Sequence, residues 1–224
     1  MSISKILLFT LIALVSTKNV VLIGDSRAVG IGVYLFGFLY SHVTPSYGTG
    51  SNIIGTSARN YGGHSCKIVA ETGASFATFV NTAKSVNRGV TTVLKGSASG
   101  TAVLLWLGVN NLNADSTGSY YKSLANKYKN LKFYVIPVTG VTSKSGISNA
   151  SIKSFNSKLN SIVKASGLSN LKYKNILQNN DPTKIVVGGK VALTVDASTT
   201  DAYGLHYKTN GYKAIFNAMV SGLK

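Results

Sequence analysis

The stretch TAVLLWL, which runs from Thr101 to Leu107, is apolar at every position after its first residue. An unbroken run of this kind is typical of a strand that is buried on both faces of a parallel sheet. A second run, LKFYVIPV, spans Leu131 to Val138, and a shorter one spans Val20 to Ile23. These three segments predict the centre of a mostly parallel sheet.

Helical segments separate these runs, so strands and helices alternate along the chain. The alternation predicts an α/β fold, a three-layer α/β/α sandwich of flavodoxin-like organisation around a mostly parallel five-stranded sheet. Residues 43–65 are rich in Gly, Ser and Asn and are interpreted as a long loop. Gly188-Gly189 predicts the two-residue turn of a β-hairpin over 185–195. The other expected strands are 67–70 and 173–177, and the expected helices are 28–40, 76–86, 120–128, 152–163 and 209–223.

The composition describes one domain with few carboxylates. The chain has 224 residues, and its 45% hydrophobic residues are enough to bury a sizeable core. Only 6 acidic residues oppose 23 basic ones, and there is 1 cysteine. This scarcity disfavours a multi-carboxylate metal site and excludes both an internal disulfide framework and a multi-cysteine zinc site. His42 and His64 lack a partner pattern and are interpreted as loop or surface residues. We expect no metal and no organic cofactor.

The excess of basic residues gives a net charge of +17 that is carried mostly by scattered lysines. Only three of the basic residues are arginines: Arg27, Arg59 and Arg88. Sequence-specific readers of nucleic acid favour the guanidinium fork, so we expect no specific nucleic-acid partner. A dispersed lysine coat suits nonspecific binding to anionic surfaces such as glycans, cell-wall polymers or membrane head groups. The alternative is that lysine only solubilises the surface, and the sequence favours neither.

The N-terminus resembles a secretory signal peptide. Lys5 precedes an apolar run from Ile6 to Val15, which is too short to span a bilayer. The alternative is a buried first strand or helix of the domain. We favour export, because a second apolar run begins almost at once, at Val20. The expected organisation is a signal peptide over 1–17 and one domain over 18–224, secreted or extracytoplasmic, without a transmembrane segment.

Polar residues that suit acyl transfer stand at the ends of the predicted strands. Ser26 follows the first strand, Gly73 follows the strand at 67–70, and Asn110 follows Leu107. His206 precedes the last helix. The carboxyl ends of parallel strands meet at one edge of a sheet, so these groups are expected on one rim. Together they supply a nucleophile, a base and hydrogen-bond donors for an oxyanion.

These blocks resemble those of the SGNH/GDSL hydrolase family, which comprises serine esterases and acylhydrolases. The segment VVLIGDSRAVG resembles the first block, GVNN the Gly-x-Asn-Asp block and GLHYKTNGY the last block, over essentially the whole mature chain. The resemblance implies that Ser26 is the nucleophile and His206 the general base. It implies an oxyanion hole formed by Ser26, Gly73 and Asn110. Without that context, Gly24-Asp25-Ser26 is also a good helix-cap sequence.

Two positions depart from the family pattern. Asn111 stands where the family has aspartate, next to the catalytic asparagine. Tyr203 stands three residues before His206, where the family has the aspartate of its triad. The nearest acid is Asp201, which we expect to orient His206, since Gly204 eases a turn that folds its carboxylate back. The alternatives are Asp196 or a backbone carbonyl.

The resemblance implies a serine esterase, and the N-terminal segment implies that it is secreted. We expect a short acyl group, because the loop expected at 43–65 is polar and the hairpin expected at 185–195 shows no large apolar surface for lipid chains. An O-acetyl group on a polysaccharide is the favoured substrate, and a lipid esterase of the same fold is the nearest alternative. An alternative of a different class is a non-catalytic, basic glycan- or surface-binding protein on a decayed hydrolase scaffold. The missing aspartate at position 203 motivates that alternative.

Overall fold

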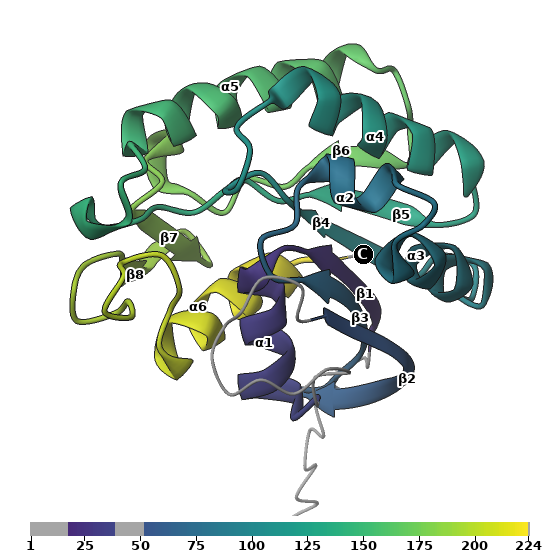
Figure 1. The fold of residues 1–224 in the computed structure, drawn as a ribbon, viewed down its shortest axis with the longest axis horizontal. Helices are drawn as coiled ribbons and strands as arrows, with labels where there is room; N and C mark the ends of the chain where they lie inside the picture. Colours follow the sequence, from purple (N-terminus) through teal and green to yellow (C-terminus); the bar gives the residue numbers. More distant parts are fainter. Residues whose placement is uncertain (1–17, 39–51, 224) are drawn as a thin grey trace, which may run out of the picture.

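A six-stranded sheet with helices on both faces forms the body of the protein (Figure 1). The computed structural model describes residues 18–38 and 52–223. The strand order is β2-β3-β1-β4-β5-β6, and every neighbouring pair is parallel except β2 with β3. In chain order the elements are β1 (Lys18–Gly24), α1 (Ser26–Phe36), β2 (Asn52–Tyr61), β3 (His64–Glu71), α2 (Phe76–Val80), α3 (Ser85–Lys95), β4 (Ala102–Trp106), α4 (Ala114–Lys127), β5 (Lys132–Val135), η1 (Ser143–Ser145), α5 (Asn149–Ala165), β6 (Leu171–Tyr173), η2 (Gln178–Asn180), β7 (Lys184–Val187), β8 (Lys190–Thr194) and α6 (Thr209–Val220).

The alternating side chains of the central strands divide the core into two layers. Val21 and Ile23 of β1 pack in a cluster with residues of α3, α4 and α5. Val20 and Leu22 point to the opposite face and pack in a cluster with residues of α1 and α6. Figure 1 shows the same arrangement, with α1 and α6 on one side of the sheet and α3, α4 and α5 on the other. The predicted α/β/α sandwich is therefore confirmed.

The predicted strand count of five is wrong, because Asn52–Tyr61 forms an additional strand, β2, inside the expected loop at 43–65. β2 pairs with β3 alone and lies at the edge of the sheet, where most of its second half is exposed. An edge strand needs no continuous apolar run, so its composition resembled a loop. Gly62 and Gly63, with φ of +58° and +77°, form the two-residue turn that joins β2 to β3.

Three smaller expectations also differ from the structure. β6 ends at Tyr173, and Ile176 and Leu177 instead pack in the core beside α6 and the β7–β8 hairpin. The helix expected over 76–86 is two helices, and α3 carries its own apolar stripe of Val86, Val90, Val93 and Leu94. His64 lies in β3, where it is half-buried with its ring centre 6.1 Å from that of Phe216. His42 lies outside the described residues.

The expected β-hairpin agrees with the described structure. The hairpin over 185–195 is present as β7 and β8, joined by Gly188 and Gly189. Cys66 is fully buried in β3, and burial raises the pKa of its thiol. None of the helices in the described segments has both the length and the apolar character needed to cross a bilayer. The signal peptide expected over 1–17 lies outside the described residues.

Candidate active site

Ser26 lies at the junction between the first strand and the first helix. β1 ends at Gly24, and Asp25 caps α1 by accepting a hydrogen bond of 3.0 Å from the backbone N–H of Arg27. Asp25 is therefore the cap residue, and Ser26 is the first residue of the helix. The backbone N–H at this position has no acceptor within the helix. The helix is capped by Asp25, so neither the hydroxyl nor the N–H of Ser26 is needed to cap it.

The side chains of Ser26, His206 and Asp201 form one hydrogen-bonded chain. His206 Nε2 lies 2.9 Å from Ser26 Oγ, and His206 Nδ1 lies 3.0 Å from Asp201 Oδ2. Ser26 is 2% exposed and His206 is 9% exposed, so these two residues are shielded from solvent, whereas the Asp201 side chain is 27% exposed. A hydroxyl, an imidazole and a carboxylate in this order let the ring accept the hydroxyl proton while the carboxylate fixes its tautomer.

A tight turn brings Asp201 to the imidazole across a spacing of five residues. Gly204 has a φ of +69°, and its N–H donates a 3.0 Å hydrogen bond to the carbonyl of Asp201. The carboxylate also accepts hydrogen bonds from the N–H groups of Leu205 and His206, at 3.1 and 3.3 Å. Tyr203, at the position of the family aspartate, is 75% exposed. The turn therefore presents Asp201 to the ring and Tyr203 to solvent.

Asp196, the other acid considered for this position, has different partners. Its carboxylate accepts hydrogen bonds from the N–H groups of Ser198 and Thr199, at 2.7 and 3.1 Å, and from the Ser198 hydroxyl. These bonds close the turn that follows β8. Asp196 is therefore engaged in local loop structure.

The electrostatic environment favours a neutral His206 and an ionised Asp201 at neutral pH. Burial lowers the pKa of the His206 imidazole, Asp201 opposes this shift, and the charge of Arg27 reinforces it. Burial also raises the pKa of Asp201, but hydrogen bonds from the His206 ring and from the backbone of Leu205 and His206 outweigh it. The net pKa of Asp201 lies below its ordinary value. A neutral imidazole beside a carboxylate is the state that a general base requires.

The Gly73 and Asn110 loops start at the same rim as Ser26 because of the strand order. Gly24 at the end of β1 is in register with Ala70 of β3 and with Trp106 of β4. The segments that follow these two strands therefore begin beside the nucleophile. The structure brings all the residues that the sequence analysis assigned to the site to one end of the sheet.

A hydrogen bond joins these two loops. Asn110 Nδ2 donates to the carbonyl of Ala74 at 2.9 Å, next to Gly73. Gly73 has a φ of +73°, which a glycine adopts without strain, and both Gly73 and Asn110 are exposed. The Asn110 amide carries a second N–H, so the bond to Ala74 leaves one donor. Their role in an oxyanion hole stays a prediction.

Arg27 is a further residue of the site, and the sequence analysis did not identify it. It is 1% exposed, and its Nε donates to the carbonyl of Leu205 at 3.2 Å. Its Nη1 donates to the carbonyl of Thr139 at 2.6 Å, and its Nη2 to that of Gly140 at 3.4 Å. One guanidinium thus joins the helix of Ser26, the segment after β5 and the residue before His206. Apart from Thr139 Oγ1, at 3.2 Å from Nη1, its acceptors are backbone carbonyls, which no sequence pattern reveals.

Tyr207 anchors the other side of His206 to the same segment. Its hydroxyl lies 2.5 Å from the carbonyl oxygen of Gly140 and 2.7 Å from Thr139 Oγ1. The guanidinium carbon of Arg27 lies 5.4 Å from the centre of the Tyr207 ring, within cation–π range. Both neighbours of His206 in the chain are therefore fixed, and the imidazole has little freedom to move.

Asn156 on α5 is a second residue that the sequence analysis missed. It is fully buried, with Oδ1 accepting from the N–H of Val138 and Nδ2 donating to the Val138 carbonyl, both at 2.8 Å. These bonds hold the segment that leads to Thr139. Asn156 shares a helix face with Ile152, Phe155 and Leu159. An amide on an apolar face signals a buried hydrogen-bond partner, so this residue was detectable.

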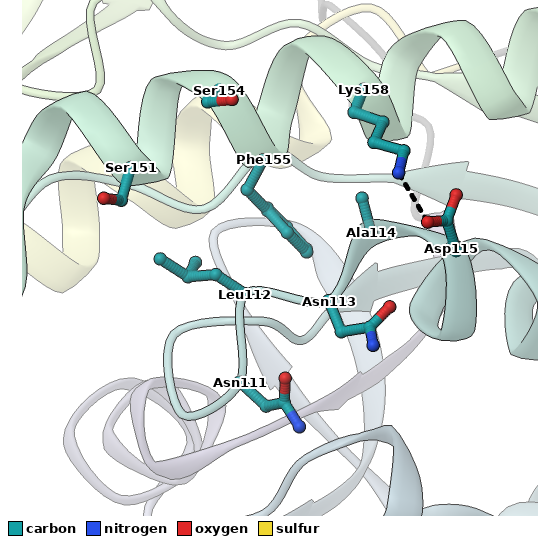
Figure 2. A pocket seen from close by; sticks show the side chains of 9 residues that line it. All are labelled: Asn111, Leu112, Asn113, Ala114, Asp115, Ser151, Ser154, Phe155 and Lys158. Atoms are coloured by element: carbon teal, nitrogen blue, oxygen red, sulfur yellow. Dashed lines mark hydrogen bonds and ion pairs between the residues drawn. The ribbon is translucent and has the colours of Figure 1, made fainter.

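A groove of about 560 Å³ opens beside the Asn110 loop (Figure 2). Figure 2 shows that it runs between the segment after Asn110 and one face of α5. Lys158 and Asp115 form an ion pair of 2.5 Å in its lining, which cancels their charges. The other lining residues are amides, hydroxyls and apolar side chains: Asn111, Asn113, Ser151, Ser154, Leu112, Ala114 and Phe155.

The described residues contain no metal-binding cluster. Across 18–38 and 52–223, no group of three or more His, Cys, Asp or Glu side chains is placed to hold a metal ion. Asn111, at the position where the family has aspartate, lines the groove.

No protein-family model and no curated protein matches this sequence. Solved structures do match it over most of its length. A lipase/acylhydrolase from Enterococcus faecalis is 14% identical with a TM-score of 0.52, and the match covers 91% of this chain and 93% of that chain. A carbohydrate esterase family 3 protein from Talaromyces cellulolyticus is 16% identical with a TM-score of 0.52, covering 90% and 94%. A member of the lipolytic protein G-D-S-L family from Veillonella parvula is 12% identical with a TM-score of 0.51, covering 90% and 96%.

This chain has the SGNH/GDSL hydrolase fold. The fold that the sequence resemblance implied is thereby confirmed. The three structures named above are described as a lipase/acylhydrolase, a carbohydrate esterase and a lipolytic protein of the G-D-S-L family. At identities of 12–16% the matches establish the architecture, and the chemistry has to be argued from the residues of this chain.

Proposed function

We propose that this protein is a serine ester hydrolase in which Ser26, His206 and Asp201 act as a catalytic triad. The observation that carries the proposal is the hydrogen-bonded chain from Ser26 Oγ through the His206 ring to Asp201 Oδ2. The missing aspartate at position 203 motivated a non-catalytic alternative. The carboxylate of Asp201 lies beside the His206 ring in place of that aspartate, which argues against the non-catalytic alternative.

In the proposed mechanism, Ser26 Oγ attacks the ester carbonyl while His206 Nε2 takes its proton. Asp201 stabilises the imidazolium that forms, and the backbone N–H groups of Ser26 and Gly73 with the Asn110 amide stabilise the oxyanion. His206 then gives its proton to the leaving alcohol, and the acyl group stays on Ser26. A water molecule then attacks the acyl carbonyl while His206 takes its proton, and His206 returns that proton to Ser26 Oγ as the bond between the acyl group and Ser26 breaks and the acid leaves.

The surroundings of Ser26 favour a small acyl group. The serine and the histidine are almost fully buried, which leaves little space for a long chain at the reacting atoms. The large apolar side chains that are exposed in the described segments are Tyr34, Val80, Val191 and Tyr203. These four are scattered over different elements, and a lipid chain favours a continuous apolar surface. A short acyl group such as acetyl is therefore our proposed substrate.

The groove beside Asn110 favours a hydroxylated alcohol as the leaving group. Its lining combines amides and hydroxyls with Leu112 and Phe155, and its one ion pair is internally neutralised. Neutral hydrogen-bonding groups around an aromatic ring suit a sugar better than a charged or purely apolar molecule. We therefore propose O-acetylated polysaccharide as the substrate class. On the basis of residues 1–17, we propose that the enzyme acts outside the cytoplasm.

The test is turnover of a chromogenic acetyl ester by the wild type and by Ser26→Ala. The variant should lose nearly all activity, and His206→Ala should do the same, with the double variant little worse than either. A serine-reactive phosphonate should label the wild type and leave Ser26→Ala unlabelled. Equal labelling of both proteins would overturn the proposal. A preference for long-chain over acetyl esters would favour the lipid-esterase alternative.

A further inference from the structure

The charged side chains are distributed unevenly between the two ends of the parallel sheet. Asp25, Glu71 and Asp201 lie at the carboxyl end, and Asp115 lies in the first turn of α4, which starts there. The other two acidic residues, Asp181 and Asp196, flank the β7–β8 hairpin. The amino end therefore holds none of the six side-chain carboxylates.

Five exposed lysines gather at the amino end, and we name this set the basic edge. Hydrogen bonds hold their segments together: Asn170 Nδ2 donates to the carbonyls of Ala125 and Leu131, at 3.0 and 3.3 Å. These bonds place the end of α4 and the start of β5 against the segment that enters β6. The basic edge consists of Lys127, Lys129, Lys132, Lys164 and Lys172.

Two adjoining hollows lie along the basic edge. The larger, of about 340 Å³, is lined by Lys164, Lys172 and Tyr173 among others. The smaller, of about 110 Å³, is lined by Lys132 and by Lys172, which the two hollows share. The Tyr173 hydroxyl is buried without a hydrogen-bond partner, and burial raises its pKa, so it keeps its proton.

Favourable interaction with helix dipoles accounts for only two of the five lysines of the basic edge. Lys127 and Lys164 stand in the last turns of α4 and α5, where a positive charge complements the helix dipole. Lys129, Lys132 and Lys172 lie outside the helices. Lys172 lines one hollow together with Lys164 and the other together with Lys132, and like charges around one hollow repel one another. An anionic partner would relieve that repulsion.

We propose that the basic edge binds a linear polyanion that carries phosphate groups. Lysine ammonium groups on flexible stems act as point charges that suit phosphate oxygens. Two hollows that share Lys172 provide adjacent binding positions for successive phosphates. The large apolar residues that are exposed in the described segments lie outside the basic edge; they are Tyr34, Val80, Val191 and Tyr203. This argues against insertion into a lipid surface and against stacking of nucleic-acid bases.

Binding at the basic edge leaves the catalytic end of the sheet open. The strands run between the two ends, so a polymer held at Lys164 and Lys172 does not cover Ser26. Such a surface would retain the protein on a phosphate-rich polymer while its site faces away. This proposal does not depend on the proposed esterase activity, and its tests measure binding alone.

The first test uses long-chain inorganic polyphosphate as the probe and measures affinity by fluorescence anisotropy with full-length protein. The edge variant is Lys129→Gln/Lys164→Gln/Lys172→Gln. The matched control is Lys153→Gln/Lys190→Gln/Lys213→Gln, which removes three exposed lysines from α5, β8 and α6. We expect the edge variant to bind at least about tenfold more weakly, and its log–log salt slope to fall by about 2 in magnitude. The control should stay within about threefold of the wild type.

Equal losses in the edge variant and the control would overturn the proposal, because binding would then follow net charge alone. A second measurement avoids substitutions: NMR amide shifts of the wild type titrated with polyphosphate. The proposal expects the largest shifts within 127–132 and 164–173. Shifts spread evenly over the surface would contradict it. Binding to vesicles with anionic lipid, with no binding to polyphosphate, would assign the edge to a membrane and also overturn it.

Discussion

The two ends of the sheet are built by the same strands, but their polar and charged groups differ in burial and in hydrogen bonding. At the carboxyl end, Ser26 and His206 are buried, and they are hydrogen-bonded to each other and to Asp201. At the amino end, Lys164 and Lys172 are exposed. Burial shifts pKa values and fixes geometry, whereas an exposed lysine contributes mainly its charge. Substitutions should therefore change chemistry at the first end and only electrostatic binding at the second.

The largest effect expected from a conservative change is that of Asp201→Asn. The amide removes the charge and favours the wrong His206 tautomer, so kcat should fall by up to about ten-thousandfold. The fold should be retained, as checked by thermal unfolding. The matched control is Asp196→Asn, which should be close to wild type in kcat. A nearly active Asp201→Asn would mean that a backbone carbonyl orients the ring.

Asn110→Ala should have a smaller effect that is confined to kcat. Loss of one oxyanion donor lowers kcat by on the order of a hundredfold or more, with a small change in KM, because the bond forms in the transition state. Asn111→Ala is the comparison, since Asn111 lines the groove and should affect KM for an acetylated oligosaccharide. Steady-state kinetics of both variants separate the two roles. A loss confined to KM in Asn110→Ala would instead make Asn110 a substrate-binding residue.

Arg27→Met should shift the pH dependence of the reaction. In the wild type, kcat/KM should fall as pH drops through the pKa of His206, which lies below its usual value. Removing the positive charge raises that pKa, so the acidic limb should move to higher pH. Asp25 also faces this region, and burial raises its pKa to about 6. Without Arg27 the pKa of Asp25 should rise further, so the Asp25 carboxyl should be protonated more often. Asp25 is not among the groups that shift the pKa of His206, so this change should affect the acidic limb little.

Arg27→Lys is the control, because it keeps a charge but lacks the fork that reaches Thr139, Gly140 and Leu205. Its acidic limb should stay near that of the wild type, while kcat should fall by about tenfold as the His206 loop loosens. Both variants should unfold more easily, by about 1–3 kcal/mol for each buried carbonyl left without a donor. An unchanged pH profile in Arg27→Met would exclude an electrostatic role for this arginine.

The smallest effect is expected at the amino end. The edge variant at Lys129, Lys164 and Lys172 should keep kcat and KM for a small acetyl ester within about twofold of the wild type. Exposed charges this far from the site are screened by salt. A large loss of turnover with an intact fold would contradict the contrast between the two ends.

The sequence predicted the central strands well, because strands buried on both faces must be apolar throughout, as in TAVLLWL. It missed β2, since an edge strand pairs on one side only and tolerates a polar surface. The Gly62-Gly63 turn before β3 was the available signal. The general rule is that sequence patterns report burial, and they are least informative where an element is half exposed.

The candidate site divides in the same way. Ser26, Gly73, Asn110 and His206 follow strands or precede a helix, so the topology alone gathers them. The contact between Asp201 and His206 depended on how one short turn folds, which spacing left open. Arg27 could not be identified, because its partners are, apart from the Thr139 hydroxyl, carbonyl groups that every residue possesses.

The buried thiol of Cys66 has a consequence for a protein that meets oxidants and electrophiles. Thiolates are the reactive form of cysteine, and a side chain enclosed in β3 with a raised pKa is held as an unreactive thiol. The folded protein should therefore neither form disulfide-linked dimers nor be alkylated at Cys66. Cysteine cannot then compete for a covalent probe, so an adduct formed on the native protein at neutral pH would report on a group other than a thiol.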